Sequence, residues 1–258
     1  MQFKQWIKFI GTALLATTFA VSSQAAIWSS SEVHYSSGDY LNSATDKHDV
    51  TTSILTFQHA SGHKYGKNFF FVDHSRSDTG SGFYGEWYST FSLSALTGTD
   101  MSFGMVKDVG LLAGLNLAPG ASSMHTLPGV SLALDLPGFA FANLDITGYN
   151  NIKTDGTSGE ESSYMLDFNW AYPFKAGGLS WSVEGHAEYI AGRDMKVGGG
   201  KLEDWILMQP QVRMDLGEAL GNEAGNLFVG IEYQYWKNKY GVKDKDESMV
   251  QFQTVWNF

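Results

Sequence analysis

The chain has 258 residues, of which 43% are hydrophobic, 14% are aromatic and only 17% are charged, and it contains no cysteine. The aromatic content excludes an intrinsically disordered chain, and the lack of cysteine excludes disulfides, a thiolate nucleophile and a thiolate metal site. The formal net charge of −10 argues against nucleic acid as a partner, because a nucleic-acid binder must neutralise phosphates with clustered basic residues.

The N-terminus has the features of a secretory signal peptide. Two lysines precede the apolar stretch at residues 9–21, and the small residues Ser23 and Ala25 stand at the positions that a signal peptidase reads. Neither this stretch nor any other apolar run reaches the ~18 residues of a membrane-spanning helix. We therefore predict a signal peptide at residues 1–25 and an exported mature domain at residues 26–258, with 15 basic and 27 acidic residues.

Alternation of apolar and polar side chains dominates the mature chain, which is the pattern of a β-strand with two different faces. Residues 179–189, for example, have Leu, Trp, Val, Gly, Ala and Tyr on one face and Ser, Glu and His on the other. Helical patterns are nearly absent. The alternation predicts twelve strands, at residues 27–36, 51–60, 67–75, 83–95, 104–117, 128–136, 139–149, 162–172, 178–191, 204–215, 226–236 and 248–258.

The connections between these segments suggest how the strands are laid out. Those after odd-numbered strands are mostly long and polar, as at residues 150–161, 192–203 and 237–247, whereas those after even-numbered strands include the short turns at 137–138 and 173–177. An even number of strands with short periplasmic turns and longer external loops is typical of a membrane barrel. The predicted fold is all-β, a twelve-stranded antiparallel transmembrane β-barrel with periplasmic termini, in the outer membrane of a Gram-negative bacterium.

A soluble periplasmic β-sandwich is the competing fold, since its two sheets also have one apolar face each. The positions of the large aromatic residues favour the barrel. Trp170, Trp181, Tyr189 and Tyr233 lie on apolar faces near strand ends, where membrane barrels have aromatic girdles. The chain also ends on an alternating strand that closes with Phe258, which resembles the signal read by the outer-membrane assembly machinery.

The polar faces of the twelve strands would line a narrow lumen. Carboxylates exceed cations there, and Arg213 is the clearest inward cation, so anionic solutes are disfavoured. Aromatic rings beside carboxylates suit a solute with a planar heterocycle and a hydroxylated sugar, such as a nucleoside. The candidate solute-binding residues are Phe69, Phe71, Asp73, Glu86, Tyr88, Glu184, Trp205, Arg213 and Glu232.

One segment resembles a known family. Glu86, the pair Phe91 and Ser92, and residues 96–104 occur in the order found in the Tsx-like nucleoside-specific channels, which include the OmpK outer-membrane proteins. The resemblance implies a monomeric twelve-stranded channel for nucleosides, with some members serving as receptors for phages or colicins. Family members often have a Pro-Arg pair where this chain has Ser89 and Thr90.

Catalytic and metal-binding readings are not supported by residue spacing. His59, His63 and His74 surround one predicted hairpin without a metal-ligand spacing, and no Gly-x-Ser-x-Gly sequence is present. We predict no enzymatic activity, no metal and no cofactor. The expected partners are the lipid bilayer, lipopolysaccharide, a small solute and the assembly machinery. The alternative function is an interaction protein, such as a phage receptor or adhesion factor, whose lumen is largely blocked.

Overall fold

Alternation of the two side-chain faces produces strands along most of the chain. The computed structural model describes residues 26–258 apart from 43–44, 46, 120–122, 153–158 and 197, so the predicted signal peptide lies outside the described residues. The strands are β1 (Trp28–Asn42), β2 (Lys47–His63), β3 (Gly66–Ser77), β4 (Gly80–Ser92), β5 (Val106–Ala118), β6 (Ser123–Leu134), β7 (Phe141–Asn151), β8 (Ser163–Ala176), β9 (Leu179–Ile190), β10 (Arg193–Asp194), β11 (Lys201–Leu202), β12 (Trp205–Met208), β13 (Gln211–Asp215), β14 (Leu227–Lys237) and β15 (Glu247–Asn257).

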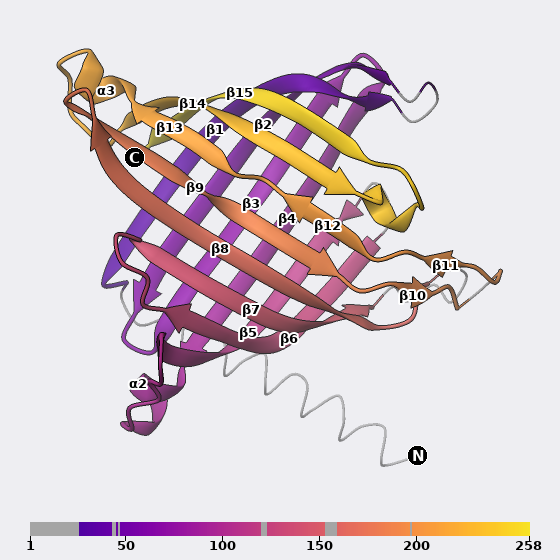
Figure 1. The fold of residues 1–258 in the computed structure, drawn as a ribbon, viewed down its shortest axis with the longest axis horizontal. Coiled ribbons are helices and arrows are strands. Elements are labelled where there is room, and N and C mark those ends of the chain that lie inside the picture. Colours follow the sequence, from indigo (N-terminus) through magenta and orange to yellow (C-terminus); the bar gives the residue numbers. More distant parts are fainter. Residues whose placement is uncertain (1–25, 43–44, 46, 120–122, 153–158, 197) are drawn as a thin grey trace.

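The strands form one closed antiparallel barrel (Figure 1). Each long strand pairs with its neighbours in the chain, and β15 pairs with β1, with Tyr35 opposite Thr254. Because the first and last strands pair, the sheet has no free edge. The short strands β10 and β11 pair only with each other and lie outside the barrel wall.

Strands β12 and β13 are two halves of one barrel strand. Both pair antiparallel with β9 and with β14, and their registers continue across the interruption at Gln209 and Pro210. Pro210 has no N–H to donate, so regular pairing stops there. Gly185 faces this break, where an added Cβ would lie 2.2 Å from the Gln209 carbonyl oxygen. With these halves joined, the barrel has the twelve strands predicted, and the predicted fold class is confirmed.

The outward face of the barrel is apolar around its circumference. Large apolar side chains with substantial exposure occur on its long strands, among them Tyr35, Leu55, Val72, Trp87, Leu111, Ile146, Leu166, Ile231, Val250, Phe252 and Trp256. A soluble protein rarely exposes a contiguous apolar surface of this extent. A bilayer removes it from water, while ring closure satisfies the backbone polar groups that lipid cannot.

The two ends of the barrel differ. The end that carries Trp28 and Phe258 also carries the helices α2 (Leu93–Thr97) and α3 (Leu216–Ala219), at the left in Figure 1. The opposite end carries β10, β11 and the short helix η2 (Lys239–Gly241). The end with the termini is the periplasmic one. No helix in the described part of the chain is long and apolar enough to cross a membrane.

The predicted alternation of long and short connections holds only in part. The external connections from β7 to β8, from β9 to β12 and from β14 to β15 are long as predicted, but two periplasmic connections, at residues 93–105 and 216–226, are also long. Both contain a capped helix. The Ser92 hydroxyl accepts a 3.0 Å hydrogen bond from the Ala95 N–H in α2, and the Asp215 carboxylate accepts one of 2.8 Å from the Glu218 N–H in α3. Such caps satisfy helix N–H groups, so a polar turn can fold into a helix.

Candidate functional site

Two side-chain contacts across the barrel establish which strand faces line its interior. Lys67 on β3 donates a 2.8 Å hydrogen bond to Asn143 on β7, although three strands separate them in the sheet. Arg213 on β13 likewise bonds Glu32 on β1. Contacts between strands that are not neighbours must pass through the interior. The polar face of each of these strands therefore lines the lumen, as its alternation indicates.

Strands β3 and β4 together form an aromatic wall of the lumen around one carboxylate. Phe69 and Phe71 share the inward face of Lys67, and the β3–β4 register places Phe69 opposite Tyr88 and Phe71 opposite Glu86. The Tyr88 hydroxyl donates a 2.8 Å hydrogen bond to Glu86, and Tyr84 also donates to this carboxylate. The Phe71 ring lies 5.9 Å from the Tyr84 ring.

This β3–β4 wall keeps some contact with solvent. Phe69, Phe71, Tyr84, Glu86 and Tyr88 are all half-buried rather than buried. Two tyrosine hydroxyls hold the Glu86 carboxylate at the centre of the wall, so its position is defined without a cation. The ring faces and the carboxylate are therefore within reach of a small solute in the lumen.

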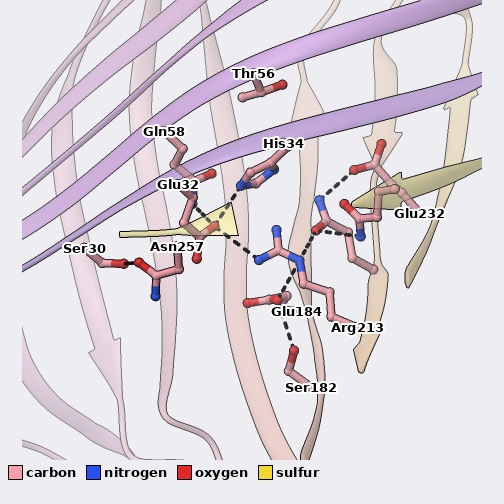
Figure 2. Close-up of polar contacts among 12 residues, drawn as sticks. Ser30, Glu32, His34, Thr56, Gln58, Ser182, Glu184, Arg213, Glu232 and Asn257 are labelled. Atoms are coloured by element: carbon pink, nitrogen blue, oxygen red, sulfur yellow. Dashed lines mark hydrogen bonds and ion pairs between the residues drawn. The ribbon is translucent and has the colours of Figure 1, made fainter. Parts of the chain in front are cut away.

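The opposite wall is cross-linked by Arg213 (Figure 2). Its Nε lies 2.9 Å from Glu184 on β9, and its Nη1 lies 3.3 Å from Glu32 on β1. Glu32 also lies 2.7 Å from His34, and Glu184 accepts a 3.1 Å hydrogen bond from Ser182. The Arg213 residue is only 6% exposed. A planar guanidinium with several donors can bridge two carboxylates in this way.

An amide network continues this wall and fills the lumen beside it. Glu232 on β14 accepts hydrogen bonds from the amides of Gln209, Gln211 and Gln251, at 3.2, 2.6 and 2.7 Å. Gln253 donates to Gln211 at 3.2 Å. Gln251 and Gln253 are each 1% exposed. The centre of this network is therefore tightly packed, whereas Gln209 and Gln211 at its side are half-buried like the residues of the β3–β4 wall.

The carboxylates of the lumen divide into two groups. Those of the first group pair with a cation, as Glu32 and Glu184 do with Arg213, and Asp167 does with His186 at 3.2 Å. Those of the second group have no ion-pair partner within the described residues and hydrogen-bond only neutral side chains. They are Asp73, Glu86, Asp145, Glu188 and Glu232. The second group gives the lumen more acidic side chains than its cations pair with in the described part of the chain.

The third cluster of side chains lies at the external mouth and consists of an apolar part and a neighbouring ion pair. Leu127, Tyr149, Met165, Ile190 and Trp205 are buried against one another there. The Tyr149 ring on β7 lies 6.1 Å from the Trp205 ring on β12. Since β8 and β9 lie between those strands, these two rings reach into the lumen and narrow its mouth.

A buried ion pair lies beside this apolar cluster. Arg193 lies 2.8 Å from Glu160, which also contacts His125 on β6. Burial alone would raise the pKa of Glu160, but the His125 hydrogen bond and the Arg193 charge outweigh it and hold that pKa below its ordinary value of 4.5. Glu160 is therefore a carboxylate anion that anchors Arg193 at the mouth.

The sequence matches, over residues 62–257, the family described as "Nucleoside-specific channel-forming protein, Tsx". The chain belongs to this family. Family and fold together make it an outer-membrane channel protein. No curated protein sequence matches the chain.

Two solved structures are similar to this chain at low sequence identity. A KdgM porin is 10% identical, with a TM-score of 0.49 over 89% of this chain and 99% of that chain. A bacterial polysaccharide outer membrane secretin is 10% identical, with a TM-score of 0.42 over 91% of this chain and 100% of that chain. The family assignment rests on the sequence match.

The segment that carried the family resemblance serves mainly the periplasmic turn. Residues 96–104 complete α2 and the turn that follows it. Gly98 ends the helix with φ of 70°, a conformation that glycine adopts without strain, and Asp100 accepts a 2.9 Å hydrogen bond from the Ser102 N–H. Glu86, at the start of the segment, is the part that faces the lumen. The family sequence thus marks the turn more strongly than the solute path.

The structure places the sequence-predicted residues in three groups. Phe69, Phe71, Asp73, Glu86 and Tyr88 lie together on the β3–β4 wall. Glu184, Arg213 and Glu232 lie on the opposite wall, and Trp205 lies at the external mouth.

Sequence reasoning missed several inward groups. Glu32, His34 and Lys67 alternate with outward side chains, so period two could have found them. Arg193 and Lys239 lie outside the long strands, where no periodicity marks a side chain that reaches inward. No group of three or more potential metal-ligating side chains occurs among the residues that the structure describes.

Proposed function

We propose that this channel passes small neutral or cationic solutes by facilitated diffusion through a narrow acidic lumen, with nucleosides as its favoured solutes. The observation that carries the proposal is the β3–β4 wall, where half-buried aromatic rings surround the Glu86 carboxylate. The family name, which specifies nucleosides, supports the same solute class. We propose no enzymatic activity for this site.

The charge of the lumen supports the exclusion of anions. Five lumen carboxylates, among them Asp73, Glu86 and Glu232, bond only neutral groups within the described residues. Lys67, which lies two residues before Phe69 on β3, donates a hydrogen bond to the Asn143 amide oxygen instead of pairing with a carboxylate in the described part of the chain. Uncompensated negative charge in a narrow passage repels anions, because the surrounding protein and lipid screen charge weakly. Nucleotides should therefore pass poorly compared with nucleosides.

The geometry of the β3–β4 wall supports a nucleoside as the solute. The rings of Phe69, Phe71 and Tyr84 follow one another at centroid distances of 6.1 and 5.9 Å. A flat base can stack on such rings, and the nearby Glu86 carboxylate can accept hydrogen bonds from ribose hydroxyls. Stacking contributes about 1–3 kcal/mol per base and tolerates different bases. A low-affinity site of this kind suits passage through a channel.

Variants of Tyr88 test the stacking role by current block in planar bilayers. Tyr88→Ala should weaken block by nucleosides of every base roughly 5- to 150-fold, the equivalent of ~1–3 kcal/mol. Tyr88→Phe is the matched control, because it keeps the ring and removes only the hydroxyl that bonds Glu86. Its nucleoside block should stay close to that of the wild type. Equal block in the wild type and Tyr88→Ala would remove Tyr88 from the solute path.

The Glu86→Gln variant removes the negative charge of this side chain and keeps its shape. This variant should reduce the cation preference measured as reversal potential in a salt gradient, and it should weaken the exclusion of nucleotides. Nucleoside block should change only slightly, since the amide oxygen still accepts hydrogen bonds. An unchanged reversal potential would show that Glu86 does not contribute to ion selectivity.

A second candidate function is that of an interaction protein, such as a receptor for a phage or colicin, with a largely blocked lumen. The buried Glu232 amide network and the Tyr149–Trp205 contact at the mouth favour it, since both fill the lumen. Single-channel recording distinguishes the two. Small cation-preferring currents support the channel for solutes, whereas inserted but silent barrels support the interaction role.

We also propose that the last strand is read by the outer-membrane assembly machinery. Phe258 is 68% exposed, and its N–H donates a 3.0 Å hydrogen bond to the Ser31 carbonyl at the closing seam of the barrel. Deleting Phe258 should lower the yield of heat-modifiable barrel in outer-membrane fractions and leave aggregates in the periplasm. Phe258→Tyr, which keeps an aromatic end, is the matched control. Normal yield after the deletion would contradict the proposal.

A further inference from the structure

Arg193 lies in an aromatic corner at the external mouth. Its guanidinium carbon is 4.9 Å from the centre of the Tyr149 ring and 4.6 Å from the centre of the Trp205 ring. The two rings stand nearly perpendicular, at 87°. A guanidinium held over two ring faces is the arrangement by which proteins bind planar cations. This corner therefore has the form of a binding site whose occupant belongs to the same chain.

The corner itself is built on the barrel wall. Tyr149 is on β7 and Trp205 is on β12, and His125 on β6 stacks on Tyr149 with ring centres 4.1 Å apart. His125 also contacts Glu160, so the carboxylate that receives the guanidinium is tied to the wall. The rings and the carboxylate thus form a cradle for a flat, N–H-bearing cation without needing Arg193 to position them.

Arg193 comes from a different part of the fold. It begins β10, which pairs only with β11 and lies beyond the barrel wall (Figure 1). The ribbon pairs through its backbone with the β7–β8 connection, where the Glu161 N–H donates to Asp194 and the Lys196 N–H donates to Gly159, both at 2.8 Å. The side-chain contacts of Arg193 are with Glu160, the two rings and the Ala191 carbonyl, so its release would break no bond between barrel strands.

The guanidinium is also incompletely satisfied in this position. Arg193 is 6% exposed, yet its buried Nε atom has no hydrogen-bond partner among the residues that the structure describes. Buried donors in folded proteins nearly always have partners, so a buried N–H without one opposes the closed position. Contacts with the two rings and with Glu160 stabilise the guanidinium in the corner, whereas the unpartnered N–H destabilises this position. Such an occupant can be displaced.

We propose that Tyr149, Trp205 and Glu160 form a subsite at the external mouth for planar, delocalised cations of the guanidinium or amidinium class, and that Arg193 is its tethered, displaceable occupant. A solute group of this class replaces the Arg193 side chain between the two rings and Glu160. This proposal rests on the proposed channel function in one respect, because we expect occupancy of the subsite to control the current. It does not require that nucleosides are the solute.

Chemical rescue of the full-length barrel in planar bilayers tests this subsite. Arg193→Ala should conduct at least twofold more than the wild type, because the tethered occupant is gone. Guanidinium chloride added on the external side should return the current of this variant toward the wild-type value. Methylammonium chloride, which has the same charge but no planar group, should not. Arg76→Ala, at an exposed arginine near the external end of β3, is the matched control and should resemble the wild type.

Several results would overturn the proposal. They are a wild-type current in Arg193→Ala, an excess current that guanidinium leaves unchanged, or an equal response to methylammonium. If Arg193→Ala does not assemble, Arg193→Lys serves instead, because lysine can keep the Glu160 ion pair but cannot stack as a plane. It should show the same guanidinium-sensitive excess current, and a wild-type current would count against the subsite.

A binding measurement separates this subsite from the channel function. In detergent-solubilised Arg193→Ala, guanidinium should change the tryptophan fluorescence in a saturable way, and the change should be lost in Arg193→Ala/Trp205→Phe. If both the wild type and Arg193→Ala are silent in bilayers, the proposed channel function fails, and the fluorescence titration alone decides the subsite. A titration without a saturable change that depends on Trp205 would overturn it.

Discussion

Arg213→Met is expected to destabilise the barrel by about 3 kcal/mol or more, the cost of breaking a buried ion pair from one side. Arg213 lies within 3.3 Å of both Glu32 and Glu184, and its removal leaves two largely buried carboxylates without the cation that they share. The methionine retains much of the side-chain volume, so the loss reports charge more than packing. Urea unfolding in lipid vesicles, followed by heat-modifiable gel migration, measures the change.

Compensating variants show whether charge is the cause. Adding Glu32→Gln and Glu184→Gln to Arg213→Met removes both uncompensated charges and should recover most of the lost stability. Arg213→Lys should lie between the wild type and Arg213→Met, since a single ammonium cannot reproduce the two-sided guanidinium contact. An unfolding midpoint in Arg213→Met equal to that of the wild type would contradict the assigned role of this cross-link.

Ile231→Arg is expected to cost about 2–4 kcal/mol, because it places a charge on the lipid-facing surface near the middle of the bilayer. Ile231 is 49% exposed and lies in the centre of β14, between Val212 and Phe252 on the neighbouring strands. Its side chain points away from the lumen, since the adjacent Glu232 points inward. The same vesicle unfolding experiment measures the loss.

Two further variants control for size and depth. Ile231→Leu keeps the apolar surface and should unfold close to the wild type. Trp256→Arg lies near the end of β15, where an outward charge is expected to cost only about 0–1 kcal/mol beyond the lost ring contacts. If Ile231→Arg and Ile231→Leu unfold alike in vesicles, the outward face at this position does not meet lipid.

We expect the acidic side chains of the lumen and the aromatic rings at its mouth to affect different properties of the channel. In the proposed channel, the carboxylates without an ion-pair partner in the described part of the chain, such as Glu86 and Glu188, are expected to set the sign of the charge that can pass. Tyr149 and Trp205 are instead expected to set the width of the external opening and the shape of the group that can occupy it. Mutations at these two places should therefore change charge selectivity and current amplitude separately.

The alternation in the sequence was enough to predict the number of strands and the membrane setting. Each strand borders lipid on one side and polar groups on the other, so a period of two is imposed along its whole length. The same pattern placed Phe69 and Phe71 on the inward face of one strand and Glu86 on the inward face of the next. These two strands are consecutive in the chain and pair as a hairpin, which the local sequence encodes. The three side chains therefore lie together on one wall of the lumen.

Which charges meet across the lumen was decided only by the tertiary structure. Arg213 and Glu32 are 181 residues apart, and they meet because β15 pairs with β1 in a particular register and both side chains are long enough to bridge the interior. Arg193 and Glu160 lie beyond the barrel strands, where no periodicity constrains a side chain. Period two determines a face, whereas partners across a closed barrel depend on closure, register and side-chain reach, none of which a strand's own sequence contains.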